Sequence, residues 1–128
     1  MKLIYQIILL SRPLNIFIAI LSVFIMSNLL SDINWINAGL ASLVLFFYMS
    51  AANILNDYID IEADRINKPY RVLVRNTINP HLIILIIIFM FFMGSFIASY
   101  LPLLSMKIAW FFALPSILLY ELILKRIP

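Results

Sequence analysis

Long apolar runs separated by short polar connections dominate the pattern of this chain. Four of these runs approach the length of about 20 residues that a helix needs to cross the hydrocarbon core of a membrane. They cover residues 13–30, 35–55, 81–100 and 103–124. The pattern therefore predicts an all-α membrane protein with four transmembrane helices, which form a single transmembrane domain over residues 1–128.

The composition supports this interpretation and narrows the chemistry. Hydrophobic residues make up 65% of the chain and charged residues 12%, whereas the apolar share of soluble domains is about 45–50%. The chain contains no cysteine, which excludes disulfides, thiolate metal sites and cysteine nucleophiles. The only histidine, His81, stands beside Pro80 at the start of an apolar run, which favours an interfacial, structural role. We therefore expect an integral, multi-pass membrane protein.

Basic residues gather on one side of the membrane if the chain crosses it four times. The residues on that side are Lys2, Arg12, Arg65, Lys68, Arg71, Arg75, Lys125 and Arg126, and Lys107 is the exception. By the positive-inside rule that side is cytoplasmic, so we expect both termini there. The net charge of +3 is then a signal of topology, and we expect no nucleic-acid partner.

Acidic residues are concentrated in one segment, from Asn53 to Arg71. On a continuous helix with about 100° per residue, four side chains fall within an arc of about 60°, with Asn56 at its edge. These four are Asn53, Asp57, Asp60 and Asp64. Glu62 points to nearly the opposite side. Because carboxylates at the end of a membrane helix are costly without a partner, this directional stripe predicts a bound cation.

Basic residues follow the stripe directly, and Pro69 ends the helix that carries it. They are Arg65, Lys68, Arg71 and Arg75. Carboxylate and amide oxygens suit Mg²⁺, which binds through one or two carboxylates plus substrate phosphates, while lysine and arginine bind the remaining phosphate oxygens. The segment therefore predicts a magnesium-bound, phosphorylated lipid at the cytoplasmic rim. Alternatively, the basic residues enforce topology or pair with the aspartates.

Three motifs in the chain resemble those of a known family. Residues 56–64 spell NDxxDxxxD, and the surrounding NILNDYIDIEADRINKPYR resembles the first signature of the UbiA superfamily of intramembrane prenyltransferases. SRPLN at residues 11–15 and YELILKR at residues 120–126 also resemble family motifs, in the same order and with similar spacing. In KPYRVLVRN, Val72 replaces a proline of many members, as in some lipid-glycerol branches.

The resemblance implies a helical bundle around a lipid-accessible cavity, of which this chain is roughly the N-terminal half. It implies magnesium-dependent transfer of a prenyl group from an isoprenyl diphosphate to a lipophilic acceptor, either a quinone precursor or a glycerol-phosphate lipid. By matching position, the Mg²⁺ ligands are Asn56, Asp57, Asp60 and Asp64, the three aspartates being the catalytic residues. The diphosphate-binding residues are Asn53, Asn56, Arg65, Lys68, Arg71, Tyr120 and Lys125.

The chain departs from the family pattern towards its C-terminus. Family members carry a second aspartate-rich motif in a later loop, and this sequence ends at Pro128 before such a motif. Three interpretations follow. The chain is a truncated or split prenyltransferase whose missing portion, or a second chain, completes the site; or it is a non-catalytic protein that binds polyprenyl phosphate; or it is an inactive structural remnant. We expect weak or absent turnover from residues 1–128 alone.

Overall fold

The computed structural model describes residues 2–29, 34–75 and 78–123, and within these ranges all regular structure is helical. The helices are α1 (Lys2–Ser11), α2 (Pro13–Leu29), α3 (Trp35–Ile59), α4 (Ile61–Asn67), α5 (Pro80–Ala98), α6 (Leu103–Ile108), the π-helical segment η1 (Ala109–Ala113) and α7 (Leu114–Leu122). No strand occurs in the described ranges. Lys125 and Arg126, which the sequence placed among the functional and topological residues, lie outside them.

Among the described residues, three helices are long and apolar enough to cross a membrane: α3, α5 and the continuous run Leu103–Leu122, which joins α6, η1 and α7. A fourth candidate combines Leu3–Ser11 with Pro13–Leu29, two helices that meet at an angle of 53°. These helices lie over the four apolar runs of the sequence, although α3 continues past residue 55 to Ile59. The prediction of an all-α membrane protein is therefore confirmed.

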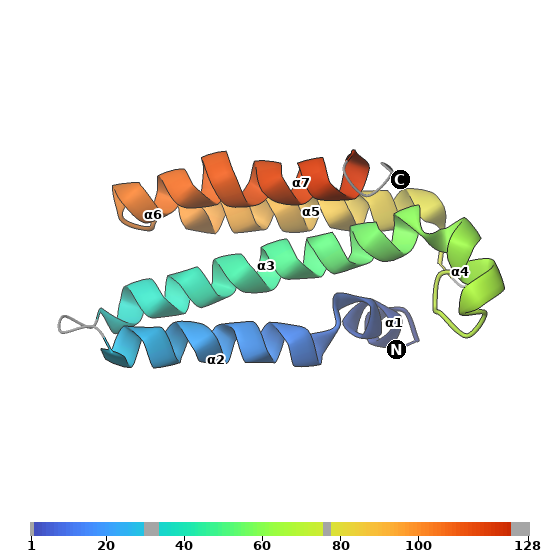
Figure 1. Ribbon diagram of the computed structural model, residues 1–128, viewed down its shortest axis with the longest axis horizontal. Helices are drawn as coiled ribbons and strands as arrows, with labels where there is room; N and C mark the ends of the chain where they lie inside the picture. Colours follow the sequence, from blue (N-terminus) through green and yellow to red (C-terminus); the bar gives the residue numbers. More distant parts are fainter. Residues whose placement is uncertain (1, 30–33, 76–77, 124–128) are drawn as a thin grey trace.

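The long helices form an elongated bundle in which α3 is central (Figure 1). It packs against α5 and α2 along its length and also contacts α1 and α7. The helices α1 and α4 and the C-terminal end of α7 lie at one end of the bundle, whereas α6 and the start of α3 lie at the other (Figure 1). The acidic segment, which spans the end of α3 and all of α4, is therefore surrounded by parts of the chain that are distant in sequence.

Prolines explain several helix boundaries. Pro13 begins α2 and Pro80 begins α5, because a residue without an N–H group loses no hydrogen bond in the first turn. The side chain of Asn79 caps α5 by accepting a hydrogen bond from the N–H of His81 at 2.9 Å. Pro115 lies just after η1, and the wider π-helical turn accommodates a residue that cannot donate to the carbonyl four positions earlier.

The helices α3 and α5 approach each other closely at Gly94. A Cβ atom at this position would lie 2.5 Å from Cδ1 of Tyr48. The tyrosine cannot move aside easily, because its side chain is buried and its hydroxyl is 2.9 Å from Oγ of Ser95. A small residue here lets two membrane helices approach closely, which is the usual way that such helices gain packing energy.

We expect Gly94→Ala to destabilise the protein by about 1–3 kcal/mol, because the added methyl group forces the α3–α5 contact apart. Gly39→Ala is the matched control, since a Cβ atom at that position would meet no packing neighbour within 4 Å; it should be neutral or stabilise the helix by up to about 1 kcal/mol. Thermal unfolding in detergent, followed by circular dichroism, measures both. Equal stability of the two variants would contradict the close α3–α5 packing.

Candidate functional site

Two aspartates and two arginines form an ion-pair network at the end of the bundle that carries α1 and α4. Nη1 of Arg71 lies 2.8 Å from Oδ1 of Asp57 and 2.5 Å from Oδ2 of Asp64. Nη2 of Arg12 lies 2.6 Å from the same oxygen of Asp57. The carboxylate side chains are only 10% and 8% exposed. The network thus joins the α1–α2 junction, the end of α3, α4 and the loop that follows α4.

The acidic segment is not one continuous helix. The helix α3 ends at Ile59, Asp60 has φ −84° and ψ 5°, and α4 begins at Ile61. The sequence-based expectation of a single helical stripe from Asn53 to Asp64 was therefore wrong. In a straight helix, Asp57 and Asp64 would be about 10 Å apart along the axis, too far for one nitrogen to contact both. The break at Asp60 permits the shared contact with Arg71.

The junction between α1 and α2 is built around Arg12, whose φ of 55° is left-handed. Such a conformation costs a non-glycine residue about 1–3 kcal/mol, and the following Pro13 disfavours the helical alternative. In a continuous α-helix the N–H of Asn15 would donate to the carbonyl of Ser11. Here it donates to the carbonyl of Arg12 at 3.0 Å, so the carbonyl of Ser11 needs another donor. Nδ2 of Asn53 supplies it at 2.8 Å. Two side-chain contacts, Arg12 to Asp57 and Asn53 to Ser11, therefore tie the junction to α3.

Arg12 is the residue of this network that the sequence-based site assignment missed. The available signal was the SRPLN motif, which carries Arg12 directly before a proline at the start of a membrane helix. Its partner Asp57 lies 45 residues further along the chain. Helical periodicity within the acidic segment carries no information about a contact over that separation.

The other predicted metal ligands lie next to the network. Nδ2 of Asn56 is 3.4 Å from Oδ1 of Asp57, and the side chain of Asp60 is partly buried at the junction of α3 and α4. One oxygen of Asp57, Oδ1, therefore accepts hydrogen bonds from one amide group and two guanidinium groups. The roles of Asn56 and Asp60 as magnesium ligands stay predictions.

The remaining predicted diphosphate residues are not gathered into the network. Arg65 is 3.3 Å from Glu62 in an exposed pair, and Lys68 is also exposed. The side chain of Tyr120 is 55% exposed, and Lys125 lies outside the described residues. The structure thus brings together Asp57, Asp64 and Arg71 from the predicted set, and the roles of the others stay predictions.

The donor atoms of this site are compatible with magnesium. Carboxylate and amide oxygens are the ligands that Mg²⁺ prefers. Within residues 2–29, 34–75 and 78–123, no three acidic, histidine or cysteine side chains are arranged to hold an ion, and the carboxylates of Asp57 and Asp64 instead share one nitrogen of Arg71. Both carboxylates are occupied by guanidinium groups, so a divalent ion bound at these oxygens would compete with the arginines for them.

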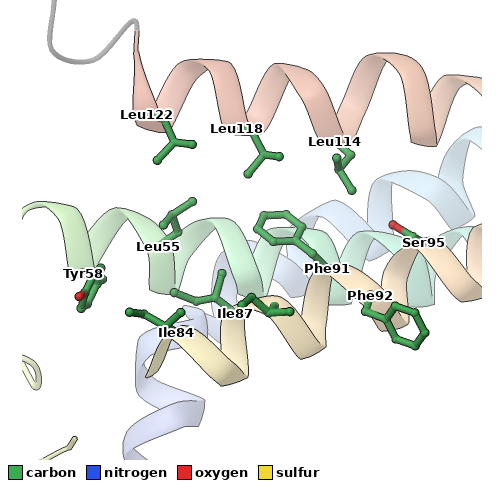
Figure 2. A pocket seen from close by; sticks show the side chains of 11 residues that line it. Leu55, Tyr58, Ile84, Ile87, Phe91, Phe92, Ser95, Leu114, Leu118 and Leu122 are labelled. Carbon is green, nitrogen blue, oxygen red and sulfur yellow. The ribbon is translucent and has the colours of Figure 1, made fainter. Parts of the chain in front are cut away.

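An apolar groove of about 530 Å³ lies between α3, α5 and α7. Figure 2 shows Tyr58 at one end, Phe92 and Ser95 at the other, and leucines of α7 facing α3 and α5 across the space. Its lining residues are Leu55, Tyr58, Ile84, Ile87, Ile88, Phe91, Phe92, Ser95, Leu114, Leu118 and Leu122. Tyr58 directly follows Asp57 in the chain, so the groove begins one residue away from the ion-pair network.

Comparisons with known proteins agree with the motifs. Residues 14–128 match the model of the UbiA prenyltransferase family. Three curated proteins named digeranylgeranylglyceryl phosphate synthase are similar to this chain. The protein from Methanobrevibacter smithii is 45% identical over 60 residues, which cover 47% of this chain and 21% of that protein. Those from Methanothermobacter thermautotrophicus and Methanococcoides burtonii are 33% and 31% identical and cover 73% and 88% of this chain.

These relatives are considerably longer than the chain. The matched regions correspond to 33% of the Methanothermobacter thermautotrophicus protein and 42% of the Methanococcoides burtonii protein. The chain therefore spans between about one fifth and two fifths of the length of the curated relatives it matches. No solved structure matches the chain significantly.

We expect Arg71→Gln to lower the stability of the metal-free protein by about 1–3 kcal/mol, because it leaves two nearly buried carboxylates close together without their shared cation. Arg65→Gln removes the same charge from an exposed pair and should change stability by less than about 0.5 kcal/mol. Thermal unfolding in detergent with a chelator present measures both variants. A loss at Arg71 no larger than that at Arg65 would show that the network does not hold this end of the bundle together.

Proposed function

The chain belongs to the UbiA prenyltransferase family, and from this premise we propose that it takes part in transferring a prenyl group from an isoprenyl diphosphate to a lipophilic acceptor. The observation that carries the proposal is an ion-pair network of Asp57, Asp64 and Arg71 beside an apolar groove. An isoprenyl diphosphate has a strongly charged head and a hydrocarbon tail. The two parts of the site suit these two parts of the molecule.

The diphosphate head is proposed to bind at the network. Cleavage of the allylic carbon–oxygen bond leaves negative charge on the departing diphosphate, so the site must supply positive charge. Mg²⁺, when bound by Asp57, Asp60, Asp64 and Asn56, supplies part of it by neutralising diphosphate oxygens. Basic side chains supply the rest through charge-assisted hydrogen bonds, and neutral amide and hydroxyl groups add hydrogen bonds without adding charge. In this proposal the basic residues are Arg65, Lys68, Arg71 and Lys125, and the neutral donors are Asn53, Asn56 and Tyr120.

The prenyl tail is proposed to lie in the groove between α3, α5 and α7. Its volume of about 530 Å³ is in the usual range of ligand pockets, about 300–1,000 Å³. Among its lining residues, Tyr58 and Ser95 carry hydroxyl groups and the others are hydrocarbon side chains. An apolar wall keeps water from the allylic carbocation, and the aromatic faces of Tyr58 and Phe91 can stabilise its positive charge.

A glycerol-phosphate lipid is the acceptor that we propose. It is supported by relatives that are named digeranylgeranylglyceryl phosphate synthase and by Val72 in the loop after the acidic segment. We further propose that the site faces the cytoplasm. The network end of the bundle carries Arg12, Arg65, Lys68, Arg71 and Arg75, whereas Lys107 lies on α6 at the other end, and cytoplasmic segments are enriched in basic residues.

Replacement of single acidic residues tests the proposed chemistry. In membranes that contain the polypeptide carrying residues 1–128, Asp57→Ala and Asp60→Ala should each lower magnesium-dependent prenyl transfer by about a hundredfold or more, because the diphosphate loses its metal. Transfer is measured with radiolabelled prenyl diphosphate and a glycerol-phosphate lipid, and the product is identified by mass spectrometry. Glu62→Ala is the control, since its side chain is 77% exposed. Equal losses at all three positions would refute a directed metal site.

Filling the groove tests the proposed tail site. Leu118→Trp should weaken binding of a long prenyl diphosphate by about tenfold, because the indole ring occupies space that the tail needs, and should affect a short prenyl diphosphate less. Leu119→Trp is the matched control, because the neighbouring Leu119 is 49% exposed and does not line the groove. Binding is measured by displacement of a radiolabelled donor. Unchanged affinity for the long donor in Leu118→Trp would rule out this groove.

A further inference from the structure

The carboxylate of Asp57 holds two cations that differ in how firmly they are bound. Arg71 makes two ion pairs, one with Asp57 and one with Asp64. Arg12 makes one, and its side chain is 36% exposed against 20% for Arg71. Both guanidinium groups contact the same oxygen, Oδ1 of Asp57. Arg12 is therefore the cation that the network can lose with the fewer broken contacts.

The charges of the network favour release of Arg12 from Asp57 when a metal binds. Two carboxylates and two guanidinium groups sum to zero, so a divalent cation at Asp57 and Asp64 leaves an excess of positive charge in a poorly exposed place. Charges of like sign at contact distance repel strongly where water is scarce. Arg71 belongs to the basic loop that is proposed to bind diphosphate. Arg12 belongs to a different part of the chain, the α1–α2 junction.

The junction that Arg12 occupies is held by apolar packing around Leu10 and by polar contacts to α3. Arg12 has the left-handed φ of 55°, a conformation that persists only when surrounding contacts enforce it. In α1, Leu10 belongs to the hydrophobic core, whereas Leu3, Ile4, Tyr5, Ile8 and Leu9 are exposed. Release of Arg12 from Asp57 would remove an ion pair between the junction and α3, while the hydrogen bond from Asn53 to Ser11 does not depend on the Arg12 side chain.

We propose that Arg12 is a positioning residue that serves as an exchangeable counter-ion: it neutralises Asp57 while the metal is absent, and metal binding displaces it and loosens the α1–α2 junction from α3. This inference rests on the proposed function, because it takes Asp57 as a metal ligand. It adds that docking of α1 depends on whether the site is occupied. A simple supporting role for Arg12 predicts the opposite response to its removal, since loss of a support would weaken metal binding.

The test uses Mn²⁺ alone as the probe, with free Mn²⁺ followed by electron paramagnetic resonance on the purified chain in detergent. Carboxylate oxygens that suit Mg²⁺ also suit Mn²⁺. Arg12→Gln should tighten Mn²⁺ binding by about threefold to thirtyfold. In the wild type, the state in which Arg12 is paired with Asp57 reduces the fraction of sites open to metal, and this variant removes that state. Arg12→Lys restores a competing cation and should return the affinity towards that of the wild type.

Arg75→Gln is the matched control for net charge, because it removes one exposed positive charge from the same end of the bundle. Screening by salt should limit its effect to less than about twofold. If Arg12→Gln weakens Mn²⁺ binding, or changes it no more than Arg75→Gln does, the exchange proposal is overturned while the metal site stands. If no variant and no wild-type protein binds Mn²⁺, the proposed metal site fails and the exchange proposal fails with it.

A second readout follows α1 itself. Because the chain has no cysteine, Tyr5→Cys introduces a unique attachment point for a spin label on an exposed position of α1, where Tyr5 is 63% exposed. Paramagnetic Mn²⁺ would broaden the spectrum of a nearby spin label, so diamagnetic Mg²⁺ is used in this experiment. Mg²⁺ should increase the mobility of the label in the wild-type background, and the label should already be mobile without metal when Arg12→Gln is also present. If neither Mg²⁺ nor Arg12→Gln changes the mobility of the label, the proposed coupling between metal binding and α1 is overturned.

Discussion

The arrangement of this end of the bundle depends on neutralising two carboxylates that are almost removed from water. Asp57 and Asp64 are expensive to bury unless cations reach them, and the cation that reaches both is Arg71. That contact requires the two acids to be closer than a straight helix allows, so α3 ends and α4 begins at Asp60. The loop after α4 is in turn held against the bundle by Arg71, with Leu73 and Ile78 packed in the same hydrophobic cluster as Ile54.

The end of α3 separates polar and apolar surroundings within a single helical turn. Asp57 contacts the two arginines, and the next residue, Tyr58, lines the groove against α5 and α7. Successive residues of a helix differ in direction by about 100°, so one short segment presents a charged environment on one side and a hydrocarbon environment on another. The proposed ligand, with an anionic head and an apolar tail, would meet both environments at the end of one helix.

The sequence predicted those features that depend on local pattern. Apolar run length located the helices, because the thickness of the hydrocarbon core imposes the same requirement on each of them. The charged motif identified Asp57, Asp64 and Arg71 as residues that belong together. The break at Asp60 was not predictable in this way, since no glycine or proline marks it and its benefit arises from a contact with residue 71. Arg12 escaped for the same reason, because its partner is 45 residues away.

The equal numbers of acids and bases in the network bear on how the protein is made. Where ligand side chains have no counter-ions of their own, folding must wait for the metal and chelators unfold the protein. Here Arg12 and Arg71 already satisfy Asp57 and Asp64, so the helices can insert and pack in a membrane before any divalent ion arrives. Under the magnesium dependence proposed above, scarcity of Mg²⁺ would limit how much of the protein is active, whereas the amount of folded protein would stay the same.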